Sequence, residues 1–132
     1  MGFNAGTILD LPFRLHGRDP ATGVDCFWVL MEYHRQEGRT VTDPLDLGRT
    51  PESCQDVLCA APDEWVAVAP PYRPGDALVL LGAAGGSLPH VAVYLGNRLA
   101  IHATEEAGVV VVPTRTLAGG LEGGYRLRCL DL

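Results

Sequence analysis

The sequence lacks the marks of membrane-spanning, exported and nucleic-acid-binding proteins. No apolar run reaches the roughly 20 residues of a transmembrane helix, and residues 1–15 lack the basic region and apolar stretch of a signal peptide. The ten basic residues are dispersed among sixteen acidic ones, for a net charge of −6, so they form no cluster that could neutralise phosphates. We therefore expect no membrane insertion, no nucleic-acid partner, and synthesis in the cytoplasm without a signal peptide.

Cysteine is also scarce. Four cysteines in 132 residues are too few for a disulfide scaffold, and no Cys-x-x-Cys pair is present. The histidines form no His-x-x-x-His pair of the kind that binds zinc. The glycine-rich stretches 83–86 and 118–124 lack the lysine of a phosphate-binding loop, so we expect them to be loop tips. The sequence therefore predicts reduced thiols and neither a metal nor a cofactor.

The remaining composition is that of one globular domain, residues 1–132. The chain is 47% apolar and 20% charged, and a chain of this length buries about two thirds of its unfolded surface. Helical patterns precede strand patterns, which predicts an α+β fold with N-terminal helices packed on an antiparallel sheet. The predicted helices cover residues 26–37 and a segment that starts at 50–52, and the predicted strands cover residues 65–69, 77–81, 90–94, 98–103, 108–112 and 125–132.

The first predicted helix begins at a cysteine. Cys26 follows a loop rich in Gly, Pro and Asp, and apolar residues recur after it at helical spacing, namely Val29, Leu30 and Tyr33. Asp25 is predicted to cap this helix, whose unpaired N–H groups and positive dipole end favour a thiolate. Cys26 is therefore either a reactive nucleophile or a buried structural thiol. His34 lies outside the apolar stripe and is expected to face solvent.

Two histidines bracket a predicted β-hairpin. Residues 90–103 alternate around a predicted loop of residues 95–97, which pairs Tyr94 with Arg98. In that register His90 lies directly opposite His102, close enough for the two imidazoles to hydrogen-bond. A cysteine at a helix start and two paired histidines would supply a nucleophile, a base and a group that orients the base. Tyr94 is expected either to support the histidines or to pack.

These motifs together carry a family resemblance. The stretches are LPFRLHGRDPATGVDC, RPGDALVLL, HVAVYLGNRLAIHA and GVVVVPTRTL, which lie in this order within residues 11–117. They resemble the NlpC/P60 (C40-type) cysteine peptidases, in which a loop leads to Asp-Cys, a Pro-Gly-Asp turn opens a strand, and two histidines follow. The resemblance implies a papain-like fold in which Cys26 is the nucleophile, His90 the general base and His102 the residue that orients it. Asp76, in the Pro-Gly-Asp turn, is expected to cap the strand entry.

The substrate-contacting residues are expected on the loop before the cysteine and on the first turn of its helix. They are Phe13, His16, Asp25 and Trp28, with a solvated loop histidine as the alternative interpretation of His16. Asp25 has two interpretations, a helix cap and a ligand for a substrate amine. The sequence departs from the family pattern at Phe27 and Trp28, where Ser-Gly or Trp-Gly is usual, and at Phe13, where a tyrosine is common. These departures put the shape of the acyl pocket and the substrate preference in question.

The resemblance implies hydrolysis of peptidoglycan stem peptides, typically between D-γ-glutamate and a diamino acid. Single-domain relatives occur among phage and prophage tail proteins, so we expect a tail-tip peptidase in the virion that acts in the periplasm or cell wall. Its partners would be tail-tip or hub proteins, docked through the Gly-rich loops or the strand at residues 125–132.

Two other functions stay open. One is a structural tail-assembly or hub protein that retains the fold with little or no activity. The other is an acyltransferase of the lecithin:retinol type, although in that family the histidines precede the cysteine, whereas here Cys26 comes first.

Overall fold

The structure, a computed structural model, describes residues 2–47, 58, 61–80 and 90–131. Of the predicted helix that starts at residues 50–52, only Leu58 is described as helical, and it is buried as expected for its apolar face. The loop tip at 83–86 lies outside the described residues. The chain forms one α-helix among the described residues, short 3₁₀ turns and two sheets. The elements are η1 (Ala5–Thr7), β1 (Arg18–Asp19), β2 (Gly23–Val24), α1 (Cys26–Gln36), η2 (Pro44–Leu47), β3 (Trp65–Val68), β4 (Ala77–Leu80), β5 (His90–Gly96), β6 (Leu99–Thr104), β7 (Gly108–Pro113), η4 (Thr114–Thr116), η5 (Ala118–Gly120), β8 (Leu121–Leu127) and η6 (Arg128–Leu130).

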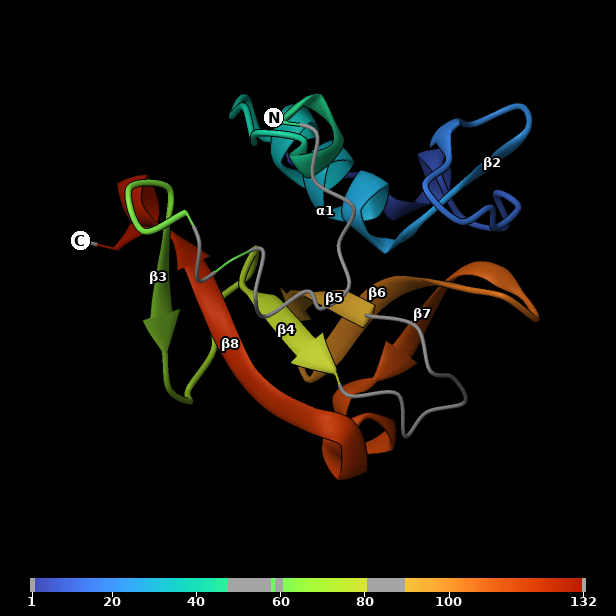
Figure 1. Ribbon diagram of the computed structural model, residues 1–132. Helices are drawn as coiled ribbons and strands as arrows, with labels where there is room; N and C mark the ends of the chain where they lie inside the picture. The colour runs from blue at the N-terminus through green and yellow to red at the C-terminus, as the bar shows by residue number, and fades with distance from the viewer. Residues whose placement is uncertain (1, 48–57, 59–60, 81–89, 132) are drawn as a thin grey trace.

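The six-stranded sheet is antiparallel, in the order β3-β8-β4-β5-β6-β7, and α1 packs against β5 and β6. Figure 1 shows α1 and the N-terminal segment together on one side of this sheet. The predicted α+β class with an antiparallel sheet is therefore confirmed. No helix within the described ranges has the length and apolar character needed to cross a bilayer.

The sheet is covered on both faces. Alternate residues of β4 belong to different buried clusters, Ala77 and Val79 to a larger one and Leu78 and Leu80 to a smaller one. A strand whose alternate side chains are all buried has no face toward water, which explains the continuous apolar run in this segment. The larger cluster also holds the apolar side chains of α1, so the helix is fixed to the sheet by the hydrophobic effect.

The last strand is central and not terminal in the sheet. β8 pairs with β3 on one side and with β4 on the other. It begins at Leu121, inside the stretch predicted to be a loop tip. Gly124 in this strand leaves room for the ring of Tyr72, which would lie 2.5 Å from a Cβ there. It ends at Leu127, before η6. The predicted strand at residues 125–132 is thus wrong in its bounds, and β8 has no open edge with which to extend a partner's sheet.

A buried ion pair joins the turn before β4 to β8. Arg126 donates from Nε and from Nη2 to the carboxylate of Asp76, each at 2.7 Å. The same carboxylate accepts a hydrogen bond from the N–H of Arg73 at 2.8 Å, which is the turn-capping contact expected from the sequence. Asp76 is only 1% exposed, so the carboxylate needs all of these donors.

Candidate functional site

Cys26 opens α1, as predicted. The carboxylate of Asp25 accepts the N–H of Trp28 at 2.9 Å, which confirms the predicted N-cap. The cysteine is 7% exposed and belongs to the larger core cluster together with Val91 and Ala103, the chain neighbours of the two histidines. The helix start and the strands that carry the histidines are therefore parts of one packed unit.

The two histidines are joined. His90, at the start of β5, and His102, on β6, approach each other at 2.5 Å between Nε2 and Nδ1, and their rings meet edge to face. Both side chains come from antiparallel neighbours in the interior of the sheet, where His90 pairs with Leu80 of β4 and His102 pairs with Val110 of β7. The sequence-based expectation of a hydrogen-bonded histidine pair agrees with this geometry.

The register that brings the pair together differs from the predicted one. Tyr94 pairs with Ala100, two residues beyond the expected partner Arg98. The reason is the turn: Asn97 and Arg98 both adopt positive φ angles, of 53° and 61°, which makes a two-residue loop preceded by an irregularity at Gly96. The histidines are consequently diagonal neighbours and not directly opposed, and they meet because imidazoles reach across that longer separation.

The pair is uncharged at neutral pH. Burial lowers the pKa of His90 to about 4, and repulsion from His102, when that ring is protonated, contributes after burial. Burial also lowers the pKa of His102. Two neutral imidazoles can share one hydrogen bond only if one ring donates its N–H to the unprotonated nitrogen of the other. The second nitrogen of each ring is then left for another partner.

A charged network surrounds the helix cap. Arg18 donates to Asp25 at 2.6 Å through Nη1 and grips Asp43 with Nε at 2.7 Å and Nη2 at 3.0 Å. Burial by itself lowers the pKa of Arg18, but the hydrogen bonds to Asp43 and Asp25 outweigh it and the pKa is raised. The guanidinium therefore stays charged between two carboxylates. Nothing in the sequence singled out Arg18 or Asp43, since no spacing rule connects Arg18 to Asp25, seven positions away, or to Asp43, 25 positions away.

The other predicted substrate contacts lie around the same helix start. Phe13 forms a bridge with Val24 and packs against the core, partly buried. His16 is half-buried in the loop before β1 and adopts a positive φ of 58°. Phe27 is 3% exposed and belongs to the core, so this departure from the family pattern fills the interior.

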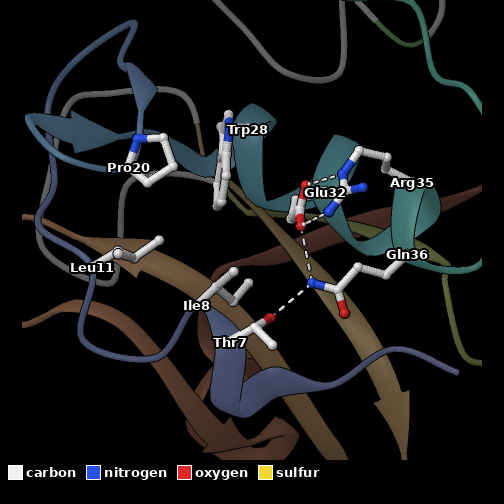
Figure 2. A pocket seen from close by; sticks show the side chains of 8 residues that line it. All are labelled: Thr7, Ile8, Leu11, Pro20, Trp28, Glu32, Arg35 and Gln36. Atoms are coloured by element: carbon white, nitrogen blue, oxygen red, sulfur yellow. Dashed lines mark hydrogen bonds and ion pairs between the residues drawn. The ribbon is translucent and has the colours of Figure 1, made fainter.

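Trp28 lines a hollow of about 330 Å³ between α1, the N-terminal segment and the β1–β2 loop. Figure 2 shows its indole beside the Pro20 ring, with the polar side chains of α1 at the opposite end. Those polar groups are already paired with one another: Arg35 forks onto Glu32 at 2.6 and 2.7 Å, and Gln36 bonds Glu32 at 2.9 Å. The hollow thus combines an apolar end at Trp28 with a polar end along the helix.

His34 contradicts the sequence-based expectation. It is fully buried, not solvent-facing, and its Nε2 lies 3.1 Å from the carbonyl oxygen of Gly75. Arg39 donates from Nε to His34 Nδ1, also at 3.1 Å. Residue 34 lies one helical turn after Leu30 and next to Tyr33, which widens the buried stripe, and that spacing was the signal that could have placed it.

No three His, Cys, Asp or Glu side chains converge as metal ligands within the described part of the chain.

Comparison with known proteins gives a fold and not a close relative. No family model matches the sequence, and no curated protein matches it. An NlpC/P60 family protein from Bacillus cereus ATCC 10987 superimposes with a TM-score of 0.64 at 22% identity over 92% of this chain and 37% of that one. An NLP/P60 family protein similar to lipoprotein, from Staphylococcus aureus subsp. aureus Mu50, gives 0.61 at 22% identity over 93% of this chain and 38% of that one.

The NlpC/P60 domain of the peptidoglycan hydrolase SagA gives a TM-score of 0.56 at 24% identity and covers 92% of each chain. The chain thus spans just over a third of the first two proteins and nearly all of the third domain. With α1 packed on a six-stranded antiparallel sheet, the chain has the fold of NlpC/P60 domains.

Proposed function

We propose that the protein is a cysteine peptidase that hydrolyses amide bonds in the stem peptides of peptidoglycan. The observation that carries the proposal is the hydrogen-bonded pair His90–His102 on the two strands against which the Cys26 helix packs. A nucleophile at a helix start and a base oriented by a third group are the parts that covalent acyl transfer requires. The fold of NlpC/P60 domains, one of them from a peptidoglycan hydrolase, supports the same function.

In the proposed mechanism His90 donates its Nε2 proton to His102 Nδ1, which leaves His90 Nδ1 unprotonated. That nitrogen takes the proton of the Cys26 thiol, and the sulfur attacks the amide carbonyl to form a C–S bond. Backbone N–H groups at the start of α1 stabilise the oxyanion. His90 returns the proton to the leaving nitrogen as the C–N bond breaks. Water, deprotonated by His90, then cleaves the acyl-enzyme and restores the thiol.

The finer specificity in the proposal is a bond between D-γ-glutamate and a diamino acid. The substrate would contact Phe13, His16, Asp25 and Trp28, which surround the helix start. The Trp28 end of the hollow is apolar and would take an apolar part of the substrate. We further propose a place in a phage tail tip, with tail-tip or hub proteins as partners and the periplasm or cell wall as the site of action.

Replacing the nucleophile tests the enzyme. Cys26→Ala and Cys26→Ser should abolish the release of soluble muropeptides from purified peptidoglycan, measured by chromatography and mass spectrometry, while the circular dichroism spectrum should stay that of the parent. An alanine variant with parental activity would exclude a cysteine mechanism. Tail particles that carry Cys26→Ala would assemble and adsorb normally but penetrate thick walls poorly. If they infect like the parent, the protein is a structural tail component.

Replacing the histidines tests their roles. Loss of proton transfer typically costs about 10²- to 10⁴-fold, so His90→Ala should be the more damaging change. His102→Asn keeps a group that can hydrogen-bond to His90 and should retain more activity than His102→Ala. If His102→Ala lowers kcat/KM more than His90→Ala does, the two roles are reversed.

A further inference from the structure

The helix cap poses an electrostatic problem for a reactive cysteine. Asp25 is needed at the start of α1, where its carboxylate accepts the N–H of Trp28 at 2.9 Å. The same carboxylate is one residue before Cys26, and a negative charge so close disfavours a thiolate. Asp25 is only 4% exposed, so solvent screens its charge poorly. A cap made by Ser or Thr carries no charge and would not disfavour the thiolate. The groups around the Asp25 carboxylate therefore decide how strongly its charge acts on Cys26.

Arg18 meets the cap at the carboxylate itself. Its Nη1 lies 2.6 Å from Asp25 Oδ1, the oxygen that also accepts from the helix backbone. The side chain of Arg18 is 23% exposed and that of Asp25 6%, so the pair is largely removed from water. A positive charge at this distance offsets the carboxylate's effect on its surroundings.

Asp43 prevents the guanidinium from moving away. It receives Nε and Nη2 of Arg18 in a two-bond fork, and the carbonyl of Gly17 receives a further bond from Nη1 at 3.0 Å. Burial raises the pKa of Asp43, but the hydrogen bond from Arg18, the N–H of Leu45 and the charge of Arg18 together outweigh burial and lower the pKa, so both partners stay charged. Arg18 is thus held from two sides in one position.

We propose that Arg18 is a positioning residue of the Cys26 site that compensates the charge of Asp25 and so permits a carboxylate cap beside a reactive thiol. The proposal rests on the proposed role of Cys26 as nucleophile. It also favours the helix-cap interpretation of Asp25, because Arg18 takes the charge of the carboxylate before any substrate group reaches it. Arg18 acts through Asp25 and needs no contact with substrate.

Alkylation by iodoacetamide tests the proposal, because the thiolate displaces iodide at a rate that follows its own population. The rate is measured on the intact protein between about pH 5 and 9, with the label located by peptide mass spectrometry at Cys26. Arg18→Gln leaves Asp25 uncompensated, so labelling at neutral pH slows about tenfold and the profile moves to higher pH. Arg18→Gln with Asp25→Asn removes both charges and returns the rate to within about twofold of the parent.

The control is Arg35→Gln on the same helix. Arg35 makes the same kind of two-bond fork, onto Glu32, but its nine-residue separation from Cys26 corresponds to about 13 Å along the helix, beyond the screening length at physiological salt. It should leave the labelling profile unchanged.

If Arg18 only holds the loop in place and its charge does not act on Cys26, removing the charge of Asp25 cannot restore the labelling rate. The double variant then labels as slowly as Arg18→Gln or more slowly, and the proposal is overturned. It is also overturned if Arg18→Gln labels like the parent. If Arg18→Gln does not fold, Asp25→Asn decides: it keeps a capping oxygen and leaves Arg18 paired with Asp43 alone, which removes one negative charge beside the thiol. Labelling several-fold faster than the parent then supports the proposal, and an equal or slower rate refutes it. Labelling needs no peptidoglycan, so failure of the parent to hydrolyse peptidoglycan would refute the proposed function and not this inference.

Discussion

His34 should make the fold sensitive to mild acid. The ring is fully buried between α1 and the turn before β4, where Nε2 donates to the Gly75 carbonyl and Nδ1 accepts from Arg39. A second proton would occupy the nitrogen that accepts from Arg39 and place two cations side by side. Burial, followed by the charge of Arg39, accordingly lowers the pKa of His34 to about 4.

The sign and size follow from linkage. The unfolded chain binds the proton at an ordinary histidine pKa of about 6.5, well above that of the folded protein, so acid favours unfolding. The stabilisation is complete above pH 6.5 and is lost as the pH falls toward 4. Between pH 7.5 and pH 5 this amounts to about 2 kcal/mol from His34 alone, as an order of magnitude.

Urea unfolding of the parent and of His34→Gln at both pH values measures this contribution. Glutamine does not titrate, so the parent should lose about 2 kcal/mol more than the variant does on acidification. The other buried histidines titrate in both proteins and cancel in the comparison. Equal losses would refute the argument, because they would mean that the buried ring takes up its proton as readily as in the unfolded chain.

Two further predictions concern the ion pair and the base. Asp76→Asn leaves the Arg126 guanidinium buried without its counter-charge and should lower the free energy of unfolding by about 3–5 kcal/mol in urea titrations. Asp131 is the exposed partner of the same arginine, at 3.8 Å, so Asp131→Asn should change the free energy of unfolding by less than about 1 kcal/mol. Because burial lowers the pKa of His90, the acid limb of kcat/KM for muropeptide hydrolysis should lie below the ordinary histidine range, and a limb near 6.5 would contradict a buried base.

The helix was predictable because its signals are local. A capping aspartate and apolar residues at helical spacing determine where α1 starts and which side it buries, and the structure places Asp25, Cys26 and Leu30 as expected. The histidine pair was also predictable, since both residues lie on one hairpin. The register was not, because it depends on which residues adopt positive φ, and Arg98 gives no such signal in the sequence.

Long-range contacts explain the other differences. The bond from Arg18 to Asp43 and the pair Asp76–Arg126 join residues 25 and 50 positions apart, and no spacing rule connects them. The interior place of β8 follows from pairing on both its sides, which a strand pattern alone cannot reveal.

The place of β8 also sets an order of events during synthesis. β4 to β7 are neighbours in both the chain and the sheet, so their hairpins can form as soon as they leave the ribosome. β3 has no neighbour in the sheet until residues 121–127 emerge, and the Asp76 carboxylate has no Arg126 until then. A nascent chain stalled before that point presents bare edges on β3 and β4 to other chains, and such edges invite aggregation. Completion of the sheet is therefore a late step, because it needs the last of the six strands to be made.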